Sequence, residues 1–258
     1  MIRDYLPGKL KRVLWGDRDK FGYLPIESDR DWRVWQEKAY TDFYQETQQK
    51  GLGQIVNGMI YPVMSRVNFD QLKILEIGPG IIRHLQYIGS EVDTYILCDI
   101  EPESLKHAER QLTESGINFQ SIIKSRSEFS LPLEDRSVDA IVTFNSLEHL
   151  YPIDDHLTEF NRVLKPGGRV IGGIPCEGGL AWGLGRYLTT RRYVHNAYSI
   201  NYDKIICWEH PNFSDAIIEK LNGYFELEQM TRHPFPKLPI DLNLMLSFIY
   251  KKRNRDIR

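Results

Sequence analysis

The sequence has 258 residues, of which 41% are hydrophobic and 26% are charged, and its formal net charge is −2. This balance is typical of a globular protein rather than a disordered or fibrous one, and so small a net charge argues against general binding of nucleic acids, which depends on Lys and Arg. Three widely spaced cysteines without a CxxC pair indicate neither a zinc site nor a disulfide framework, so we expect no metal and a cytoplasmic location.

Residues 1–70 are predicted to form a helical extension, with one helix at about 29–49 and a second at about 54–66. Aromatic side chains recur on one face of the first helix. They are Trp32, Trp35, Tyr40 and Phe43. This face either packs the extension onto the main domain or lies over a ligand as a lid. No stretch approaches the roughly 20 apolar residues that span a bilayer, and the start lacks the apolar segment of a signal peptide, so we expect no transmembrane segment.

Residues 71–258 are predicted to form the main domain, in which short apolar strands alternate with helices. Strands are predicted at residues 73–77, 94–99, 119–123, 138–144, 169–174, 225–230 and 244–250. Helices are predicted directly after residue 80, at about 101–115, at 154–164 and at 214–223. Such repeated strand–helix units imply a mostly parallel sheet with helices on both faces. Residues 175–212, rich in Gly, aromatic residues and Arg, interrupt the alternation and are predicted to be an insertion.

A glycine-rich turn follows the first predicted strand, where the sequence reads Glu76-Ile-Gly78-Pro-Gly80. Glycines let the backbone turn tightly and approach a ligand closely. Asp99 ends the next strand, where a carboxylate can accept hydrogen bonds from ribose hydroxyls. The dinucleotide fingerprint G-x-G-x-x-G would place its third glycine at residue 83, and this chain has Arg83 there, which argues against a nicotinamide cofactor.

With these residues in place, the sequence resembles the class I S-adenosylmethionine-dependent methyltransferases, in the branch that includes ubiquinone-biosynthesis-like and other small-molecule enzymes. The resemblance covers about residues 72–174. Its landmarks are LEIGPG (75–80), CDIEPESL (98–105), SLPLEDRSVDAIVTFNSLEHL (130–150) and FNRVLKPGG (160–168). It implies a Rossmann-like α/β fold with a seven-stranded, mostly parallel sheet. It also implies that S-adenosylmethionine is the cofactor and S-adenosylhomocysteine the product.

The resemblance also assigns residues to the cofactor. They are Glu76, Gly78, Pro79, Gly80, Asp99, Ile100, Ser127, Glu128, Asn145 and Ser146. In this pattern the glycine turn holds the methionine portion, Asp99 binds the ribose and Ile100 lies beside the adenine. Many relatives carry an Asp before Leu-Pro that contacts the adenine amino group; this chain has Ser127 and Glu128 in that stretch, and either one would substitute for it. The last two residues of the set end the fourth strand and would face the transferable methyl group.

Three histidines are candidates for a catalytic base, because a neutral imidazole accepts a hydroxyl proton near neutral pH. His149 follows the fourth strand directly, and His195 and His210 lie in the insertion. The alternative for each is a structural polar group that packs or shapes the pocket. Glu148 is expected to be an orienting carboxylate.

The insertion is expected to select the acceptor. Its arginines and tyrosines could bind an anionic acceptor such as a phosphate or a nucleotide-linked sugar, or they could form a solvated basic face. These residues are Arg186, Arg191 and Arg192, with Tyr187, Tyr193 and Tyr198.

The predicted function is methyl transfer to a hydroxyl oxygen of a small or medium acceptor of the sugar or natural-product type. The alternatives are C-methylation of a quinone-like ring, a non-catalytic cofactor-binding module, and an RNA or protein methyltransferase. The Asn/Asp-Pro-Pro-Tyr/Phe motif of enzymes that methylate amino groups of nucleic acids is missing, so we expect no nucleic acid as partner.

Overall fold

The computed structural model describes residues 1–39, 51–89 and 91–253. A seven-stranded sheet runs through the molecule in the order β3-β2-β1-β4-β5-β7-β6. The strands are β1 (Lys73–Ile77), β2 (Thr94–Asp99), β3 (Phe119–Ile123), β4 (Val138–Phe144), β5 (Leu164–Pro175), β6 (Phe225–His233) and β7 (Met245–Lys252). All neighbours pair in parallel except β7, which is antiparallel to both β5 and β6. The predicted Rossmann-like architecture is therefore confirmed.

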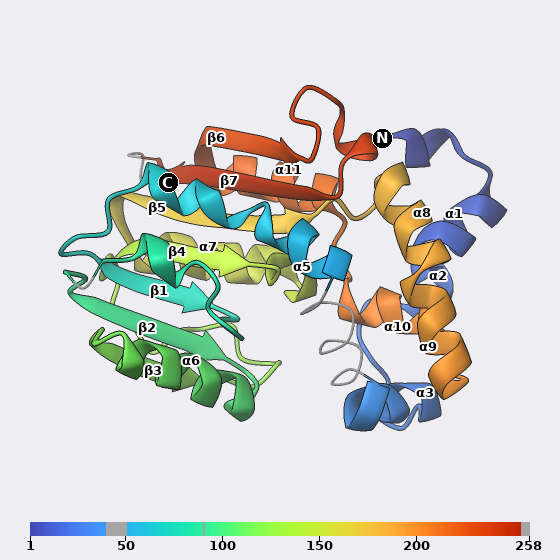
Figure 1. Ribbon diagram of the computed structural model, residues 1–258, viewed down its shortest axis with the longest axis horizontal. Helices are drawn as coiled ribbons and strands as arrows, with labels where there is room; N and C mark the ends of the chain where they lie inside the picture. The colour runs from blue at the N-terminus through green and yellow to red at the C-terminus, as the bar shows by residue number, and fades with distance from the viewer. Residues whose placement is uncertain (40–50, 90, 254–258) are drawn as a thin grey trace.

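Helices cover both faces of the sheet (Figure 1). Helices α7 (Ile153–Val163) and α11 (Ser214–Tyr224) pack on one face, where the buried cluster includes Phe160. Helix α6 (Pro102–Glu114) and the 3-10 helix η4 (Tyr61–Arg66) pack on the other, with α5 (Gly51–Gly58) beside them. Successive side chains of a strand point to opposite faces, so the continuous apolar strands are buried from both sides.

The helix predicted directly after residue 80 is wrong. In the described residues 81–89 the only helical element is a single 3-10 turn, η5 (Leu85–Tyr87). The backbone of Ile82 bonds to a side chain instead: its N–H donates to Oε1 of Gln111 at 2.8 Å, and its carbonyl accepts from Nε2 of Gln111 at 3.1 Å. Because α6 satisfies these backbone groups, the loop does not need helical hydrogen bonds of its own.

A second group of helices lies beside the sheet, at the right in Figure 1. From the N-terminal segment it takes η1 (Ile2–Tyr5), α1 (Gly8–Trp15), α2 (Arg18–Phe21), α3 (Arg30–Val34) and the π-helical turn η2 (Trp35–Ala39). From the insertion it takes α8 (Leu180–Leu188), α9 (Thr190–Tyr198) and α10 (Tyr202–Glu209). Trp32, fully buried, packs in the same cluster as Ile205 and Trp208. We refer to residues 1–39 and 180–209 as the helical unit.

The N-terminal extension therefore contributes to two places. Residues 1–39 join the helical unit, whereas the second predicted helix becomes α5 and η4 and packs on the sheet. The remainder of the first predicted helix, with Tyr40 and Phe43, lies outside the described residues. The division of the chain at residue 70 stays a prediction. None of the helices in the described part of the chain has the length and apolar character needed to cross a bilayer.

Candidate functional site

The carboxyl ends of β1, β2 and β4 meet at the edge of the sheet that faces the helical unit (Figure 1). The glycine turn lies at this edge, with φ of +65° at Gly78 and +51° at Gly80, a region that strains residues with a side chain. The Gly78 N–H donates to the Cys98 carbonyl at 2.9 Å. A Cβ at Gly78 would lie 2.5 Å from Oγ of Ser146, which itself donates to the Ile77 carbonyl at 2.9 Å. The turn is thus held between β2 and the end of β4.

Asp99 is placed to receive a ribose. Its Oδ1 accepts from the N–H groups of Ile100 and Glu101 at 2.7 and 2.9 Å, and within the described residues its Oδ2 has no hydrogen-bond partner. Burial raises the pKa of this carboxyl, and the two backbone hydrogen bonds oppose the rise. Beside it, Ile100 is 37% exposed and Ile123, at the end of β3, is 58% exposed.

This edge fits the cofactor that the sequence implies. A carboxylate oxygen without a partner, two exposed isoleucines and a glycine turn can hold a ribose, an adenine and an amino-acid portion respectively. Ile123 was not predicted from the sequence; the signal available was its position at the carboxyl end of the third strand.

Glu128 and Ser127 lie exposed in the loop after β3. This loop starts at Lys124, whose N–H donates to the Asp99 carbonyl at 3.0 Å. Their contact with adenine stays a prediction.

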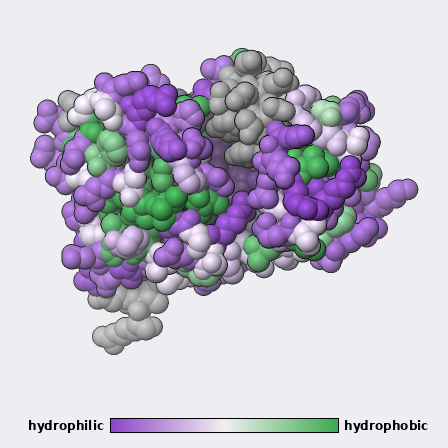
Figure 2. All heavy atoms as spheres, turned by 90° about the horizontal axis from the view of Figure 1, so that it is seen from below, coloured by the Kyte–Doolittle hydropathy of each residue, from purple (hydrophilic) through white to green (hydrophobic). Residues whose placement is uncertain are grey.

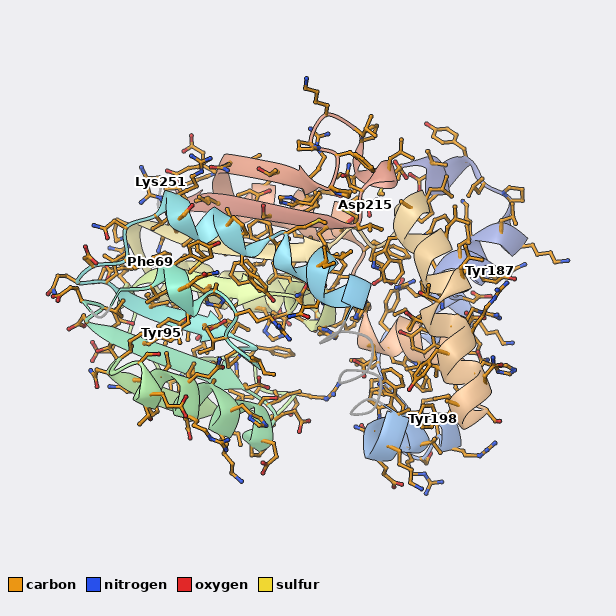
Figure 3. All side chains as sticks on the ribbon, in the orientation of Figure 1. Phe69, Tyr95, Tyr187, Tyr198, Asp215 and Lys251 are labelled. Atoms are coloured by element: carbon orange, nitrogen blue, oxygen red, sulfur yellow. The ribbon has the colours of Figure 1, made fainter. Side chains whose placement is uncertain are left out.

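Glu76 has a different environment from the rest of the turn. Glu76 is 1% exposed, and its carboxylate accepts from the Tyr95 hydroxyl at 2.7 Å. The hydroxyl oxygen of Tyr95 also lies 3.1 Å from Nε2 of His84. Tyr95 sits inside the sheet domain (Figure 3). This buried trio fixes the loop after β1 against β2. A direct contact of Glu76 with the cofactor stays a prediction, as does one of Asn145, whose N–H donates to the Gly173 carbonyl at 2.8 Å.

The burial of Glu76 predicts a pH effect on stability. Burial raises its pKa from an ordinary value of 4.5 to about 8, so the folded state binds the proton more tightly than the unfolded state. The contribution of Glu76 to the free energy of unfolding is fully present below its pKa in the unfolded state. It is lost as the pH rises through its pKa in the folded state. We expect Glu76→Gln, which cannot ionise, to lose less free energy of unfolding than the wild type between pH 5 and pH 8. Urea unfolding at both pH values measures this difference, and parallel losses in the two proteins would contradict it.

A second cluster lies where the 3-10 helix η6 (Leu147–His149) meets the end of α10. The imidazole rings of His149 and His210 meet edge to face, with centroids 4.6 Å apart. Three carboxylates surround them. The histidine–carboxylate cluster consists of Glu148, His149, Glu177, Glu209 and His210. Its members come from three segments of the chain, after β4, after β5 and at the end of the insertion.

Each imidazole lies beside a carboxylate, and each of these carboxylates accepts a hydrogen bond from a residue of the N-terminal segment. Nδ1 of His210 bonds to Glu177, whose other oxygen accepts from Nη2 of Arg18 at 3.1 Å. Nδ1 of His149 lies 3.6 Å from Oε2 of Glu209, whose Oε1 accepts from Nε1 of Trp35 at 2.9 Å. Arg18 was not predicted from the sequence, and Trp35 was predicted only on an aromatic face that packs the extension onto the main domain or covers a ligand. Only the fold brings them to the cluster, because they act through residues far along the chain.

Burial and mutual charge shift the titration of this cluster. Burial lowers the pKa of His149, and the adjacent His210 lowers it further. Burial opposes protonation of His210 too, but the carboxylates of Glu177, Glu148 and Glu209 outweigh it and raise its pKa. The Glu148 side chain is 2% exposed, and burial raises its pKa to about 7. His149 is 38% exposed, and its lowered pKa favours the neutral imidazole, the form that can accept a proton from a bound molecule.

Asn212 clamps η6 to the chain that carries His210. Its Nδ2 donates to the Leu147 and Leu150 carbonyls at 3.1 and 2.6 Å. Asn212→Ala leaves these carbonyls unpaired, so we expect a loss of about 1–3 kcal/mol in the free energy of unfolding. We also expect kcat to fall with little change in cofactor affinity, because the pair of histidines loses its alignment. Asn196→Ala, on the exposed face of α9, is the control, and a variant at 212 that unfolds and turns over like this control would contradict the clamp.

The third histidine and the arginines lie elsewhere. His195 is exposed on α9, beside a shallow surface hollow lined by Arg30 and Asp31, so the structure does not bring it to the other two. Arg186 and Arg191 both bond to the carboxylate of Asp203, at 3.0 and 2.8 Å. These bonds stabilise the helical unit. Because both guanidinium groups are paired with Asp203, the structure gives no support to anion binding by them. The aromatic residues of this stretch also lie in the helical unit, as Figure 3 shows for Tyr187 and Tyr198.

The candidate site draws on two parts of the molecule. The glycine turn and Asp99 lie on the sheet, and Glu177, Glu209 and His210 lie at the boundary with the helical unit. Seen from below, the molecular surface is hollowed between the sheet and the helical unit (Figure 2).

Comparison with known proteins agrees with this geometry. Residues 75–172 match a family model described as a methyltransferase domain. A highly reducing polyketide synthase, verA of Penicillium polonicum, is 30% identical over 137 residues, which are 49% of this chain and 5% of that protein. The ubiquinone/menaquinone biosynthesis C-methyltransferase UbiE of Shewanella sp. is 29% identical over 104 residues, which are 39% of this chain and 41% of that protein. The chain thus spans less than half the length of these relatives.

Solved structures share the fold. The N-methyltransferase NodS of Bradyrhizobium japonicum, solved with S-adenosyl-L-homocysteine, superposes with a TM-score of 0.58 at 13% identity. The match covers 87% of this chain and 99% of that one, so it extends beyond the sheet to most of the described elements.

Proposed function

We propose a methyltransferase function for this chain, which contains a class I S-adenosylmethionine-dependent methyltransferase domain. The acceptor that we propose is a hydroxyl oxygen of a small or medium-sized molecule of the sugar or natural-product type. The observation that carries this choice is the histidine–carboxylate cluster, which stands at the same edge of the domain as the cofactor-binding residues.

The residues of the sheet would hold the cofactor. Asp99 offers its Oδ2 to the ribose, Ile100 and Ile123 offer apolar surface to the adenine, and the backbone of the glycine turn lies where the methionine portion would bind. S-adenosylmethionine supplies a methyl group already activated by its sulfonium. The remaining task of the chain is to align the acceptor and to exclude water, which is expected to supply much of the rate.

A hydroxyl is a poor nucleophile unless its proton is removed as it reacts, whereas an unprotonated amine needs no such help. The imidazole of His149 is 38% exposed and can take that proton, and the Glu209 carboxylate beside its Nδ1 stabilises the imidazolium that results. His210, held by Glu177, fixes the orientation of the His149 ring. This arrangement supports an oxygen acceptor.

Carbon is the second candidate, since one relative is named as a C-methyltransferase and another as a polyketide synthase. A base also serves C-methylation, because an activated ring or chain carbon must lose a proton. The two candidates differ in product, so the bond formed decides between them.

The experiment is methyl transfer from S-adenosylmethionine with an isotope-labelled methyl group. The purified chain is incubated with sets of sugar hydroxyls, hydroxylated polyketides and reduced quinone-like rings, and the products are identified by mass spectrometry and carbon NMR. We expect label in a methyl ether. Label bonded to carbon would transfer the proposal to the second candidate, and label in no acceptor, with a chain that binds the cofactor, would support a non-catalytic module.

A further inference from the structure

The histidine–carboxylate cluster has the composition of a metal site. Glu148, His149 and His210 each offer one ligand atom, and these atoms all lie within 4.8 Å of one another. Two imidazoles and one carboxylate form a donor set that first-row transition cations such as Zn²⁺, Mn²⁺ and Fe²⁺ accept, whereas Mg²⁺ and Ca²⁺ prefer oxygen ligands alone. The short distances require only small side-chain movements for all three groups to reach one ion.

The surroundings of the two imidazoles have the form found around metal-binding histidines. Such a histidine usually presents one ring nitrogen to the metal and the other to a carboxylate, which fixes the tautomer. Here Nδ1 of His210 bonds to Glu177, and Nδ1 of His149 lies 3.6 Å from Glu209. The Nε2 atoms are left for the ligand role. Arg18 and Trp35 hold the two outer carboxylates in place.

Glu148 provides an independent observation. Its side chain is 2% exposed, and within the described residues Oε2 has no hydrogen-bond partner. A buried carboxylate oxygen without a partner costs free energy, which the rest of the fold must offset. A cation bound between Glu148 and the two imidazoles would supply the missing partner.

We propose that Glu148, His149 and His210 bind one divalent transition cation. His149 is 38% exposed, so an acceptor oxygen can reach an ion bound to it from outside. The cation site stands on the geometry alone. A bound cation would occupy Nε2 of His149, so in that state the cation, and not this imidazole, would activate the acceptor oxygen by lowering the pKa of its hydroxyl, and this use rests on the proposed function. The cysteines, which lack zinc-site spacing, led us to expect no metal, and the ligands proposed here come from two distant segments that share no spacing motif.

Cobalt binding tests the site without reference to activity. The full chain, purified without a histidine tag and treated with a chelator, is titrated with Co²⁺ while visible absorption is recorded, and Zn²⁺ competition gives its affinity. We expect one Co²⁺ per chain, displaced by Zn²⁺. Glu148→Gln preserves the size of the side chain and should weaken binding by about 100-fold, as should His210→Ala. His107→Ala removes an exposed histidine on α6 and should bind like the wild type.

Titration of the same samples with S-adenosylhomocysteine separates this proposal from the proposed function. A folded wild-type chain that binds S-adenosylhomocysteine but takes up no Co²⁺ or Zn²⁺ would overturn the cation site and leave methyl transfer standing. Unchanged Co²⁺ affinity in Glu148→Gln would overturn it as well. Co²⁺ binding that responds to Glu148→Gln, in a chain that does not bind S-adenosylhomocysteine, would support the site and contradict the proposed function.

Discussion

Asp99→Ala should weaken the binding of S-adenosylhomocysteine by about 100-fold, because a carboxylate that accepts hydrogen bonds from two ribose hydroxyls contributes about 2–3 kcal/mol. The carboxylate ends β2 at the edge of the sheet, and its Oδ2 is not used by the described protein groups. The loss appears in the dissociation constant from isothermal titration.

Asp99 also accepts two backbone hydrogen bonds, so its removal could act through the fold. Asp99→Asn separates the two effects, because the amide oxygen can still accept from Ile100 and Glu101 while the charge is lost. We expect the Asn variant to lie between the wild type and the Ala variant in affinity. Glu103→Ala removes an exposed charge from the first turn of α6 and should bind like the wild type. Equal affinities for the Ala variant and this control would show that the ribose lies elsewhere.

His149→Ala should lower kcat by about 10²–10⁴-fold, the range that a positioned proton acceptor contributes. The affinity for S-adenosylhomocysteine should stay within about threefold, because the ring lies on the acceptor side and not against Asp99. Single-turnover transfer with the best acceptor of the labelled-methyl experiment measures the effect.

The matched control for His149→Ala is His107→Ala, which removes an exposed imidazole from α6, outside the histidine–carboxylate cluster. His210→Ala should resemble His149→Ala in kcat, since each ring orients the other. Full turnover by both cluster variants would exclude a histidine-assisted reaction. It would favour an acceptor that needs no deprotonation, such as an amine.

The first four strands were predicted with the bounds that the structure shows, 73–77, 94–99, 119–123 and 138–144. Buried parallel strands leave continuous apolar runs, which are readable from one sequence. The helix expected after residue 80 failed because Gln111, from a distant part of the chain, satisfies the loop. Local patterns carry no information on such a partner.

The same limit applies to the site. The glycine turn and Asp99 lie in one strand–turn–strand unit, so their spacing alone predicted where they meet. His149 and His210 were each candidates, but nothing in the sequence indicated that their rings would touch. Arg18 and Trp35 reach the cluster only because residues 1–39 fold against the insertion, a tertiary arrangement without a local signature.

We expect this chain to bind S-adenosylmethionine at the end of β2 and to transfer its methyl group. Isothermal titration of the wild-type chain with S-adenosylmethionine and S-adenosylhomocysteine, with NAD as the control ligand, tests this expectation most directly. We predict saturable binding of both sulfur ligands with dissociation constants of about 1–100 μM and no heat from NAD. A folded chain that binds neither sulfur ligand, or that prefers NAD, would contradict the account.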